Sequence, residues 1–320
     1  MKTRLYYLLL ALLCASLPAS AGINKQTFIY SIKDGDTLRL DRYESPQFTE
    51  AKPCIIFVFG GSFMRGDRGD ATYIPFYEYF ASRGYAVVAI DYRLGLKDVQ
   101  KKIDMKQGRL KLFNALVDHL EGAISMAVED LFDATRFVVE HADEWRIDTQ
   151  RITSCGASAG AITVLQGEYE ICNRMSRTAA LPEGFNYASV ISFAGCIFSE
   201  STVAWQTAPA PILFFHGDAD KNVPYDKLKF LRFGMYGPKQ IVKYLNEMQS
   251  PYCFYSVENA EHEIATAPMH HHLAEIKIFL DKFVDGRATL FLHTTETAIG
   301  KPEMKKKLKL KDCLKANFSY

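Results

Sequence analysis

Gly156-Ala157-Ser158-Ala159-Gly160 decides how this chain is interpreted, because it stands between a strand-like run and a helix-like run. The run before it is Arg151-Ile152-Thr153-Ser154-Cys155, and the run after it is Ala161-Ile162-Thr163-Val164-Leu165. A serine on a sharp turn from strand to helix has a strained backbone and an outward hydroxyl, and flanking glycines avoid collisions that a Cβ would make. The pattern therefore predicts a nucleophilic serine, although the pentapeptide alone also fits a small-residue helix start.

Strand-like and helix-like segments alternate along the rest of the chain, which is typical of an α/β fold. The turn-rich Lys33-Asp34-Gly35-Asp36 predicts an opening antiparallel hairpin. The predicted strands are Phe28–Ile32, Thr37–Tyr43, Cys54–Phe59, Tyr85–Ile90, Arg151–Cys155, Tyr187–Phe193, Ile212–Phe215 and Cys253–Val257. The predicted helices are Ile124–Trp145, Lys227–Met248 and His271–Val284. We expect a mostly parallel central sheet with helices on both faces.

Residues 1–21 have the composition of a signal peptide. Lys2 and Arg4 are followed by an apolar run from Leu5 to Leu17 and then by Ala19-Ser20-Ala21. The run is too short for a membrane span, and the A-x-A pattern favours cleavage after Ala21, with a short membrane anchor as the alternative. We therefore expect an exported protein, periplasmic or secreted, with one domain over residues 22–320 and no stable membrane insertion after cleavage.

Two segments stand apart from the regular alternation. Residues 96–122 carry scattered charge and a modest amphipathic pattern, which predicts either part of a lid or pocket wall or a helical insertion that only packs. The basic tail, residues 301–320, has lysines clustered at 305–307, 309 and 311. A solvated terminal face is the expected structure for that tail, rather than a nucleic-acid or membrane patch. The net formal charge is +1, so no nucleic-acid partner is expected.

The cysteines do not indicate a metal or redox site. Six lie beyond residue 21, and none forms a C-x-x-C pair. Cys54, Cys155 and Cys196 lie in or beside apolar runs, where a buried free thiol is the common state. Export permits disulfides, so the pairing stays open. The chain also lacks a metal-ligand cluster, a dinucleotide fingerprint and a P-loop, and we expect no cofactor and no metal.

A serine hydroxyl needs a base within hydrogen-bond reach and an acid that orients the base. The acid candidates are Asp218 and Asp220, which follow the predicted strand Ile212–Phe215; a surface Asx turn is the alternative for either. The base candidate is His262, which follows the last predicted strand. Of the other histidines, His216 lies within the acid loop, and His270, His271 and His272 are expected at a solvated helix start.

Reaction at a carbonyl also requires donors for the developing oxyanion, and preorganised backbone amides serve well. Ala159, directly after the serine, supplies one N–H. The loop Phe59-Gly60-Gly61-Ser62-Phe63 follows a predicted strand, and its glycines let the backbone approach a substrate closely. We expect the N–H groups of Gly61 and Ser62 to complete the oxyanion hole, with a plain turn as the alternative.

Together these segments resemble the α/β-hydrolase superfamily, and within it the bacterial carboxylesterase and lipase-like members. The resemblance covers nearly all of the chain after residue 21. It rests on Phe59–Phe63, Asp91-Tyr92-Arg93-Leu94-Gly95, Asp130, Gly156–Gly160, the loop 216–224 and Glu261-His262. In that family, H-G-x-x-D-x-x-V-P carries the acid at its aspartate, which is Asp220 here, and the family's histidine matches His262. The H-G-G-G loop of hormone-sensitive-lipase-like members is altered, because Phe59 replaces the histidine and Ser62 the third glycine.

The resemblance implies a serine carboxylic-ester hydrolase that acts through Ser158, His262 and Asp220 and an acyl-enzyme, on a small or carbohydrate-linked ester. A prolyl-oligopeptidase-like serine peptidase is one alternative. Those enzymes usually have a glycine where Ala161 stands, and no propeller precedes this domain. A non-catalytic binding scaffold is the other alternative, although such chains normally lose a triad member. The oligomeric state stays open.

Overall fold

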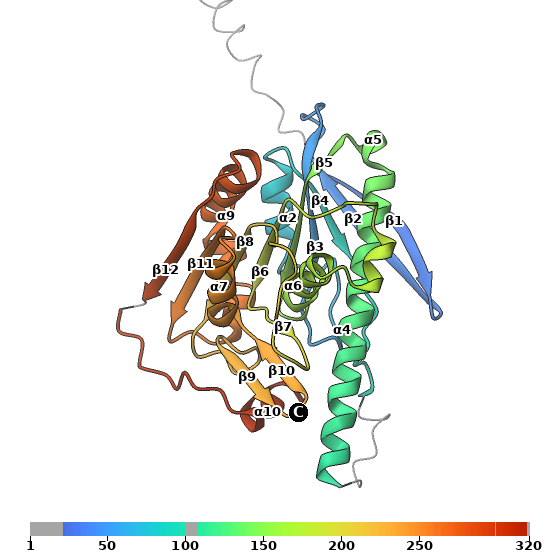
Figure 1. Cartoon of the computed structure of the whole chain (residues 1–320). Helices are drawn as coiled ribbons and strands as arrows, with labels where there is room; N and C mark the ends of the chain where they lie inside the picture. The colour runs from blue at the N-terminus through green and yellow to red at the C-terminus, as the bar shows by residue number, and fades with distance from the viewer. Residues whose placement is uncertain (1–21, 100–107, 298, 319–320) are drawn as a thin grey trace, which may run out of the picture.

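The computed structural model describes residues 22–99, 108–297 and 299–318. The predicted signal peptide and residues 100–107 of the segment 96–122 lie outside the described residues. Within the described residues, nine strands form one sheet in the order β1-β2-β4-β3-β5-β6-β8-β11-β12 (Figure 1). The strands are β1 Asn24–Lys33, β2 Asp36–Glu44, β3 Lys52–Val58, β4 Ala86–Ile90, β5 Ile147–Ala157, β6 Ser189–Phe193, β8 Ile212–Gly217, β11 Tyr252–Glu258 and β12 Phe291–Thr297.

The sheet is parallel except at its β1 edge. β1 pairs with β2, and β2 with β4, in antiparallel register, while the pairs from β4 to β12 are parallel. The eight predicted strands are confirmed, with shifts of a few residues at their ends. β12, an edge strand with every residue exposed, was not predicted from the sequence. A strand that buries neither face lacks the apolar pattern by which strands are recognised.

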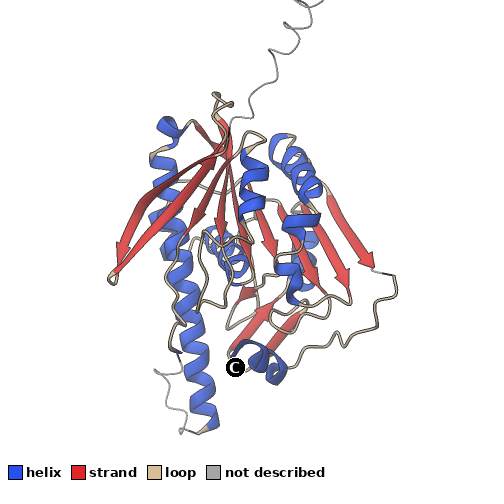
Figure 2. Cartoon of the chain, turned by 180° about the vertical axis from the view of Figure 1, so that it is seen from behind, coloured by secondary structure: helices blue, strands red, loops and turns tan. Residues whose placement is uncertain are grey.

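Helices cover both faces of the sheet, as predicted. α4 Arg109–Glu140 and α6 Ala159–Cys172 lie on one face, and α2 Ile74–Ala81 and α9 Leu273–Phe279 lie on the other (Figures 1 and 2). Further helices among the described residues are α5 Ala142–Trp145, α7 Pro238–Glu247, α8 Pro268–His271, α10 Leu310–Phe318, the short 3₁₀ helices η1 Ser176–Ala180 and η2 His262–Ala265, and the π-helical η3 Leu280–Asp285. Because both faces are covered, central strands such as β3 and β4 are buried and almost continuously apolar.

The predicted helix Lys227–Met248 is wrong over its first half. β9 Lys227–Phe230 and β10 Phe233–Tyr236 form a hairpin that joins β7 Ile197–Phe198 in a second sheet, in the order β7-β10-β9. Lys227-Leu228-Lys229-Phe230 alternates polar and apolar residues, the period of a strand, and Leu231 turns the chain with φ of 51°. The helix begins only at Pro238, a favourable first position.

The predicted helix Ile124–Trp145 begins earlier than expected. α4 starts at Arg109, so residues 109–122 are its first half, which extends past the sheet (Figure 1). Inside the molecule, the buried Arg93 fixes the loop after β4 to α4. Its backbone N–H donates to Asp130 Oδ2 at 2.7 Å, and its guanidinium contacts the same carboxylate and Glu129. Residues 91–95 and Asp130, which both contribute to the resemblance to α/β-hydrolases, are therefore joined by a buried ion pair.

The expectation of a solvated C-terminal tail needs correction. The lysines at 305–307, 309 and 311 are exposed, as predicted, but the apolar residues among them are not. Leu308 and Leu310 are half-buried and pack on the core, and Cys313 is buried. The many lysines led to the prediction of a solvated segment, and the short amphipathic helix α10 was therefore not predicted.

The cysteines agree with the expectation of buried thiols. All six cysteines among the described residues are free and buried, including Cys54, Cys155 and Cys196. In the same part of the chain, no helix is both long enough and apolar enough to cross a bilayer.

Candidate active site

Ser158 lies on a strained turn between β5 and α6. Its φ of 52° and ψ of −116° are unfavourable for any residue with a Cβ, and its N–H donates to the Phe193 carbonyl at 2.8 Å. A Cβ on Gly156 would lie 2.3 Å from the Gly160 carbonyl, and one on Gly160 would lie 2.0 Å from the Val58 carbonyl oxygen. The two glycines are therefore required for the close approach of β3, β5 and α6 that forces the serine outward.

The structure brings Ser158, His262 and Asp220 together from three separate strand ends. Ser158 Oγ lies 2.7 Å from His262 Nε2, and His262 Nδ1 lies 2.7 Å from Asp220 Oδ2. Ser158 follows β5, Asp220 follows β8, and His262 opens η2 just after β11. Because these strands are parallel, their carboxyl ends meet at one edge of the sheet. With the His262 proton on Nδ1 toward Asp220, Nε2 is free to accept the serine proton.

The geometry separates the two aspartate candidates. The Asp220 side chain is fully buried, and its Oδ1 accepts the N–H groups of Asn222 and Val223 at 2.7 and 3.0 Å. Burial by itself would raise the pKa of Asp220, but the hydrogen bond and charge of His262, together with the Val223 N–H, outweigh it and hold the pKa below the ordinary value. Asp220 is therefore suited to stay ionised beside the imidazole.

Asp218 faces away from the imidazole and has a different role. Its Oδ1 accepts the Asn259 N–H at 2.7 Å, and its Oδ2 pairs with Lys306 Nζ at 2.8 Å. These contacts join the loop after β8 to the loop after β11 and to the C-terminal tail. Asp218 thus holds loops together, in agreement with the preference for Asp220.

His216, which the sequence analysis set aside, lies directly behind the acid. The ring is buried, and its Nε2 lies 3.1 Å from the Val223 carbonyl and 3.5 Å from Asp220 Oδ2. Burial lowers its pKa, so the neutral ring, with its proton on Nε2, donates toward these oxygens. The signal was available in the sequence, because His216 is the first residue of the same H-G-x-x-D pattern that pointed to Asp220.

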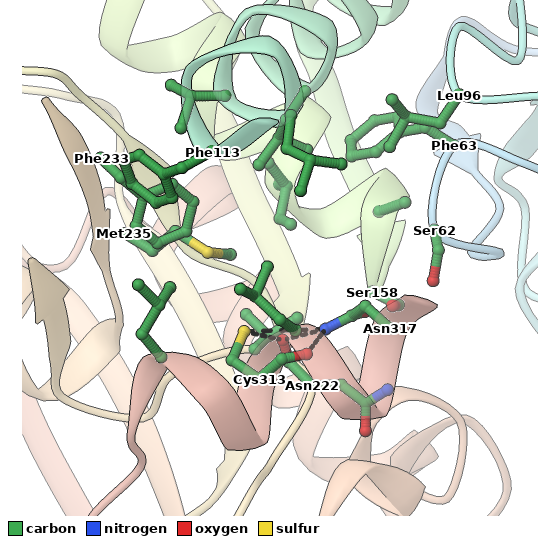
Figure 3. Close-up of a pocket in the computed structure, with 18 residues that line it drawn as sticks. Ser62, Phe63, Leu96, Phe113, Ser158, Asn222, Phe233, Met235, Cys313 and Asn317 are labelled. Atoms are coloured by element: carbon green, nitrogen blue, oxygen red, sulfur yellow. Dashed lines mark hydrogen bonds between the residues drawn. The ribbon is translucent and has the colours of Figure 1, made fainter. Parts of the chain in front are cut away.

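The residues expected to form an oxyanion hole lie around Ser158. Gly61, Ser62 and Phe63 have positive φ angles of 130°, 56° and 58°, and a Cβ on Gly61 would lie 1.9 Å from the Arg65 carbonyl oxygen. Ser62 and Ala159 line the same pocket as Ser158, and Gly61 precedes Ser62 in this strained turn (Figure 3). Ala159 is the first residue of α6, where N–H groups have no intrahelical acceptor and the helix dipole favours negative charge.

An apolar pocket of about 680 Å³, part of it open to solvent, begins at Ser158 (Figure 3). Its walls come from the loops after β3, β4 and β8, the first half of α4, the start of α6, strand β10, and α10. Its apolar lining residues are Phe63, Leu96, Phe113, Leu116, Val117, Leu120, Ala159, Ile162, Val223, Phe233, Met235, Leu310 and Leu314. Leu96 and the residues from α4 belong to the segment for which a pocket wall was one of the two expected roles.

The contributions of β10 and α10 to the pocket were not predicted from the sequence. Phe233 and Met235 were assigned to a helix, and Leu310, Cys313, Leu314 and Asn317 to a solvated tail. Among residues 22–99, 108–297 and 299–318, no group of three or more metal-ligating side chains is found.

Comparisons with known proteins show what this chain is similar to. Residues 40–102 match the BD-FAE family model. The chain is similar to Thermogutta terrifontis esterase 2 in its native form, with a TM-score of 0.56 and 21% identity over 85% of this chain and 95% of that one. The propionate-bound form of that esterase gives a TM-score of 0.55 and 20% identity over 85% and 97%. Its form phosphonylated by cyclosarin gives 0.55 and 18% over 83% and 96%.

A search of curated proteins finds no match. The structural similarity extends over most of both chains, which confirms the predicted α/β-hydrolase fold.

Proposed function

We propose that this protein is a serine carboxylesterase that uses Ser158 as nucleophile, His262 as general base and acid, and Asp220 as the acid that orients the imidazole. The observation that carries the proposal is the pair of 2.7 Å contacts that link these three side chains beside an apolar pocket. The match to the BD-FAE model and the similarity to an esterase structure support it.

The reaction begins when Ser158 Oγ attacks the ester carbonyl carbon. His262 Nε2 takes the hydroxyl proton as the Oγ–C bond forms, and the carbonyl oxygen becomes an oxyanion. The backbone N–H groups of Ala159, Gly61 and Ser62 stabilise that charge. His262 then gives its proton to the leaving alcohol as the ester C–O bond breaks, which leaves an acyl group on Ser158.

Water completes the cycle. His262 takes a proton from a water molecule, whose oxygen attacks the acyl carbon, and the proton returns to Ser158 Oγ as the acid product leaves. Asp220 stays ionised throughout, because its contacts hold its pKa low, and it stabilises the imidazolium that forms twice.

The lining of the pocket restricts the range of possible substrates. Apolar side chains surround the space beside Ser158, so the group that enters it is an aliphatic or aryl part of a small or carbohydrate-linked ester. A sugar would lie at the open mouth, because its hydroxyl groups would find few partners inside. We further propose that the protein is exported, periplasmic or secreted, as the composition of residues 1–21 indicates.

Substitution of Ser158 tests the function, and Ser154, on the strand β5 that leads into Ser158, provides a matched control. Ser158→Ala should lower kcat/KM for an aryl acetate by at least about 10³-fold and abolish labelling by a fluorophosphonate. Ser154 is buried, and its hydroxyl has no hydrogen-bond partner among the described residues, so Ser154→Ala should change neither. Activity of Ser158→Ala within a few-fold of the parent would contradict the mechanism.

The same assays separate the alternatives. A prolyl-oligopeptidase-like peptidase would also release product from a proline or alanine arylamide, whereas a carboxylesterase would cleave only the aryl ester. A non-catalytic scaffold would not be labelled by the fluorophosphonate at all.

A further inference from the structure

The C-terminal strap, residues 301–317, crosses the loops that carry two of the proposed catalytic residues. Lys301 Nζ lies 3.2 Å from Glu263 Oε1, beside His262, and the Met304 N–H donates to Asn259 Oδ1 at 2.9 Å. Lys306 pairs with Asp218 at the start of the loop that carries Asp220. The strap therefore has specific polar partners along most of its length, which a solvated tail would lack.

At its end, the strap folds into α10 and closes one side of the pocket. Asn317 Nδ2 donates to the Asn222 carbonyl at 2.9 Å, and Cys313 Sγ lies 3.4 Å from the same oxygen. Asn222 follows Asp220 by two residues, so α10 is fastened to the acid loop itself. Figure 3 shows Cys313 and Asn317 beside Asn222, with Ser158 close by.

One face of α10 is directed into the pocket. The lining residues Leu310, Cys313, Leu314 and Asn317 follow the spacing i, i+3, i+4 and i+7, which is a single helical stripe. Lys311 and Lys315, on the other side of the helix, are exposed.

The first half of α4 presents a matching stripe across the pocket. Phe113, Leu116, Val117 and Leu120 have the same spacing, and all four line the same space. Figure 3 shows α4 and α10 on opposite sides of the cavity. An apolar group that enters beside Ser158 therefore lies between two helices that are far apart in the sequence.

We propose that α10 is the wall that limits the length of the aliphatic chain this site accepts, with Leu314 and Leu310 as specificity-determining residues. The inference rests on the proposed esterase function and deepens it. A methylene that is buried between the two stripes contributes about fourfold to kcat/KM. Once the chain meets α10, a further methylene has no space, and kcat/KM stops rising or falls.

Two substitutions at Leu314 should move this limit in opposite directions. Leu314→Ala removes the outer carbon atoms of the side chain and should shift the optimal chain by about two or three methylenes to longer esters, with about 10-fold or more gain at the new optimum over the parent. Leu314→Phe fills space and should shift the optimum to shorter chains. Lys315→Ala, on the exposed side of the same helix, is the matched control and should leave the profile unchanged.

The test is kcat/KM for two ester series, measured with the full chain. In one series the acyl group runs from acetate to dodecanoate on a fixed p-nitrophenol. In the other the alcohol runs from methanol to decanol on a fixed acetate. A shift in the first series places the acyl chain against α10, and a shift in the second places the alcohol there. Identical profiles for the parent, Leu314→Ala and Leu314→Phe in both series would overturn the proposal.

A binding measurement keeps this result separate from the proposed chemistry. In the Ser158→Ala background, calorimetry with straight-chain primary amides, from butanamide to decanamide, should show the same opposite shifts without any hydrolysis. If the parent hydrolysed no ester but the amide profiles still shifted, the esterase proposal would fail and the role of α10 would stand. Amide profiles that do not respond to Leu314, in a protein that hydrolyses esters, would reject the role of α10 alone.

Discussion

Asp218 and Asp220 permit a sharp test of the catalytic assignment, because they are two residues apart and have separate partners. In Asp220→Asn, the new Oδ1 can still accept the N–H groups of Asn222 and Val223, so the loop keeps its shape. The new amide nitrogen then faces His262 Nδ1, where the carboxylate Oδ2 was 2.7 Å away. An amide N–H donates to this ring nitrogen, which forces the imidazole proton onto Nε2.

The tautomer change determines the size of the effect. A protonated Nε2 cannot accept the proton of Ser158 across the 2.7 Å contact, and the imidazolium loses its counter-charge. The same exchange of aspartate for asparagine in the triad of a serine protease lowers kcat by about 10⁴-fold, which is about 5.5 kcal/mol in the barrier. We expect a loss of this order for Asp220→Asn. Asp218→Asn should cost less than about 10-fold, since Asp218 reaches the site only through loop contacts.

The assay is kcat for an aryl acetate at neutral pH, together with circular dichroism and a urea unfolding curve for each variant. Equal losses in the two variants, or activity of a folded Asp220→Asn within about 10-fold of the parent, would refute the assignment of Asp220. A large loss in Asp218→Asn alone would transfer the role to the other aspartate.

Two stability predictions follow from buried carboxylates. Asp130 is fully buried against Arg93, so Asp130→Ala should lower the free energy of unfolding, measured in urea, by about 3 kcal/mol. Glu129 contacts the same arginine but its side chain is 43% exposed, so Glu129→Ala should lower it by less than about 1 kcal/mol. Equal losses in the two variants would show that burial does not strengthen the contribution of Asp130. The folded-state pKa of Asp220 is depressed, so its contribution to stability is present above the ordinary aspartate pKa of about 3.9 and is lost as the pH falls through the folded value. The difference in unfolding free energy between the parent and Asp220→Asn should therefore fall as the pH drops below about 4, and a difference that stays constant from about pH 5 to about pH 2 would contradict a depressed pKa.

The sequence was informative wherever chemistry imposes a local rule. The strained turn at Ser158 requires small neighbours, and Gly156 and Gly160 make the contacts that a Cβ would forbid. The central strands are buried on both faces, so their apolar runs are easily recognised. Asp220 and His262 follow strand ends in a fixed order, and the structure places both within hydrogen-bond distance of their expected partners.

The sequence was uninformative where structure depends on distant partners. Leu228 and Phe230 alternate with lysines as in a strand, yet the segment also fits one side of a helix, and only the pairing of β9 with β10 decides between them. β12 buries no side chain and is held by its backbone pairing with β11. No pattern within either segment specifies the partner strand, so local periodicity cannot predict the pairing.

In the pocket, the reactive groups could be predicted from the sequence, but the residues that determine which ester is accepted could not. The reactive atoms come from short motifs whose spacing is fixed by the chemistry. Two facing walls of the pocket, in contrast, come from apolar stripes about 200 residues apart, near Phe113 and Leu314, which any amphipathic helix could supply. Each stripe alone is an ordinary helix face, and it acquires a role only because α10 is fastened to Asn222 in the acid loop. It follows that substitutions in the strap should change which ester is accepted far more than whether an acetate is cleaved. The hydrogen bond from Asn317 and the contact of Cys313 with the same carbonyl hold the α10 wall against the acid loop.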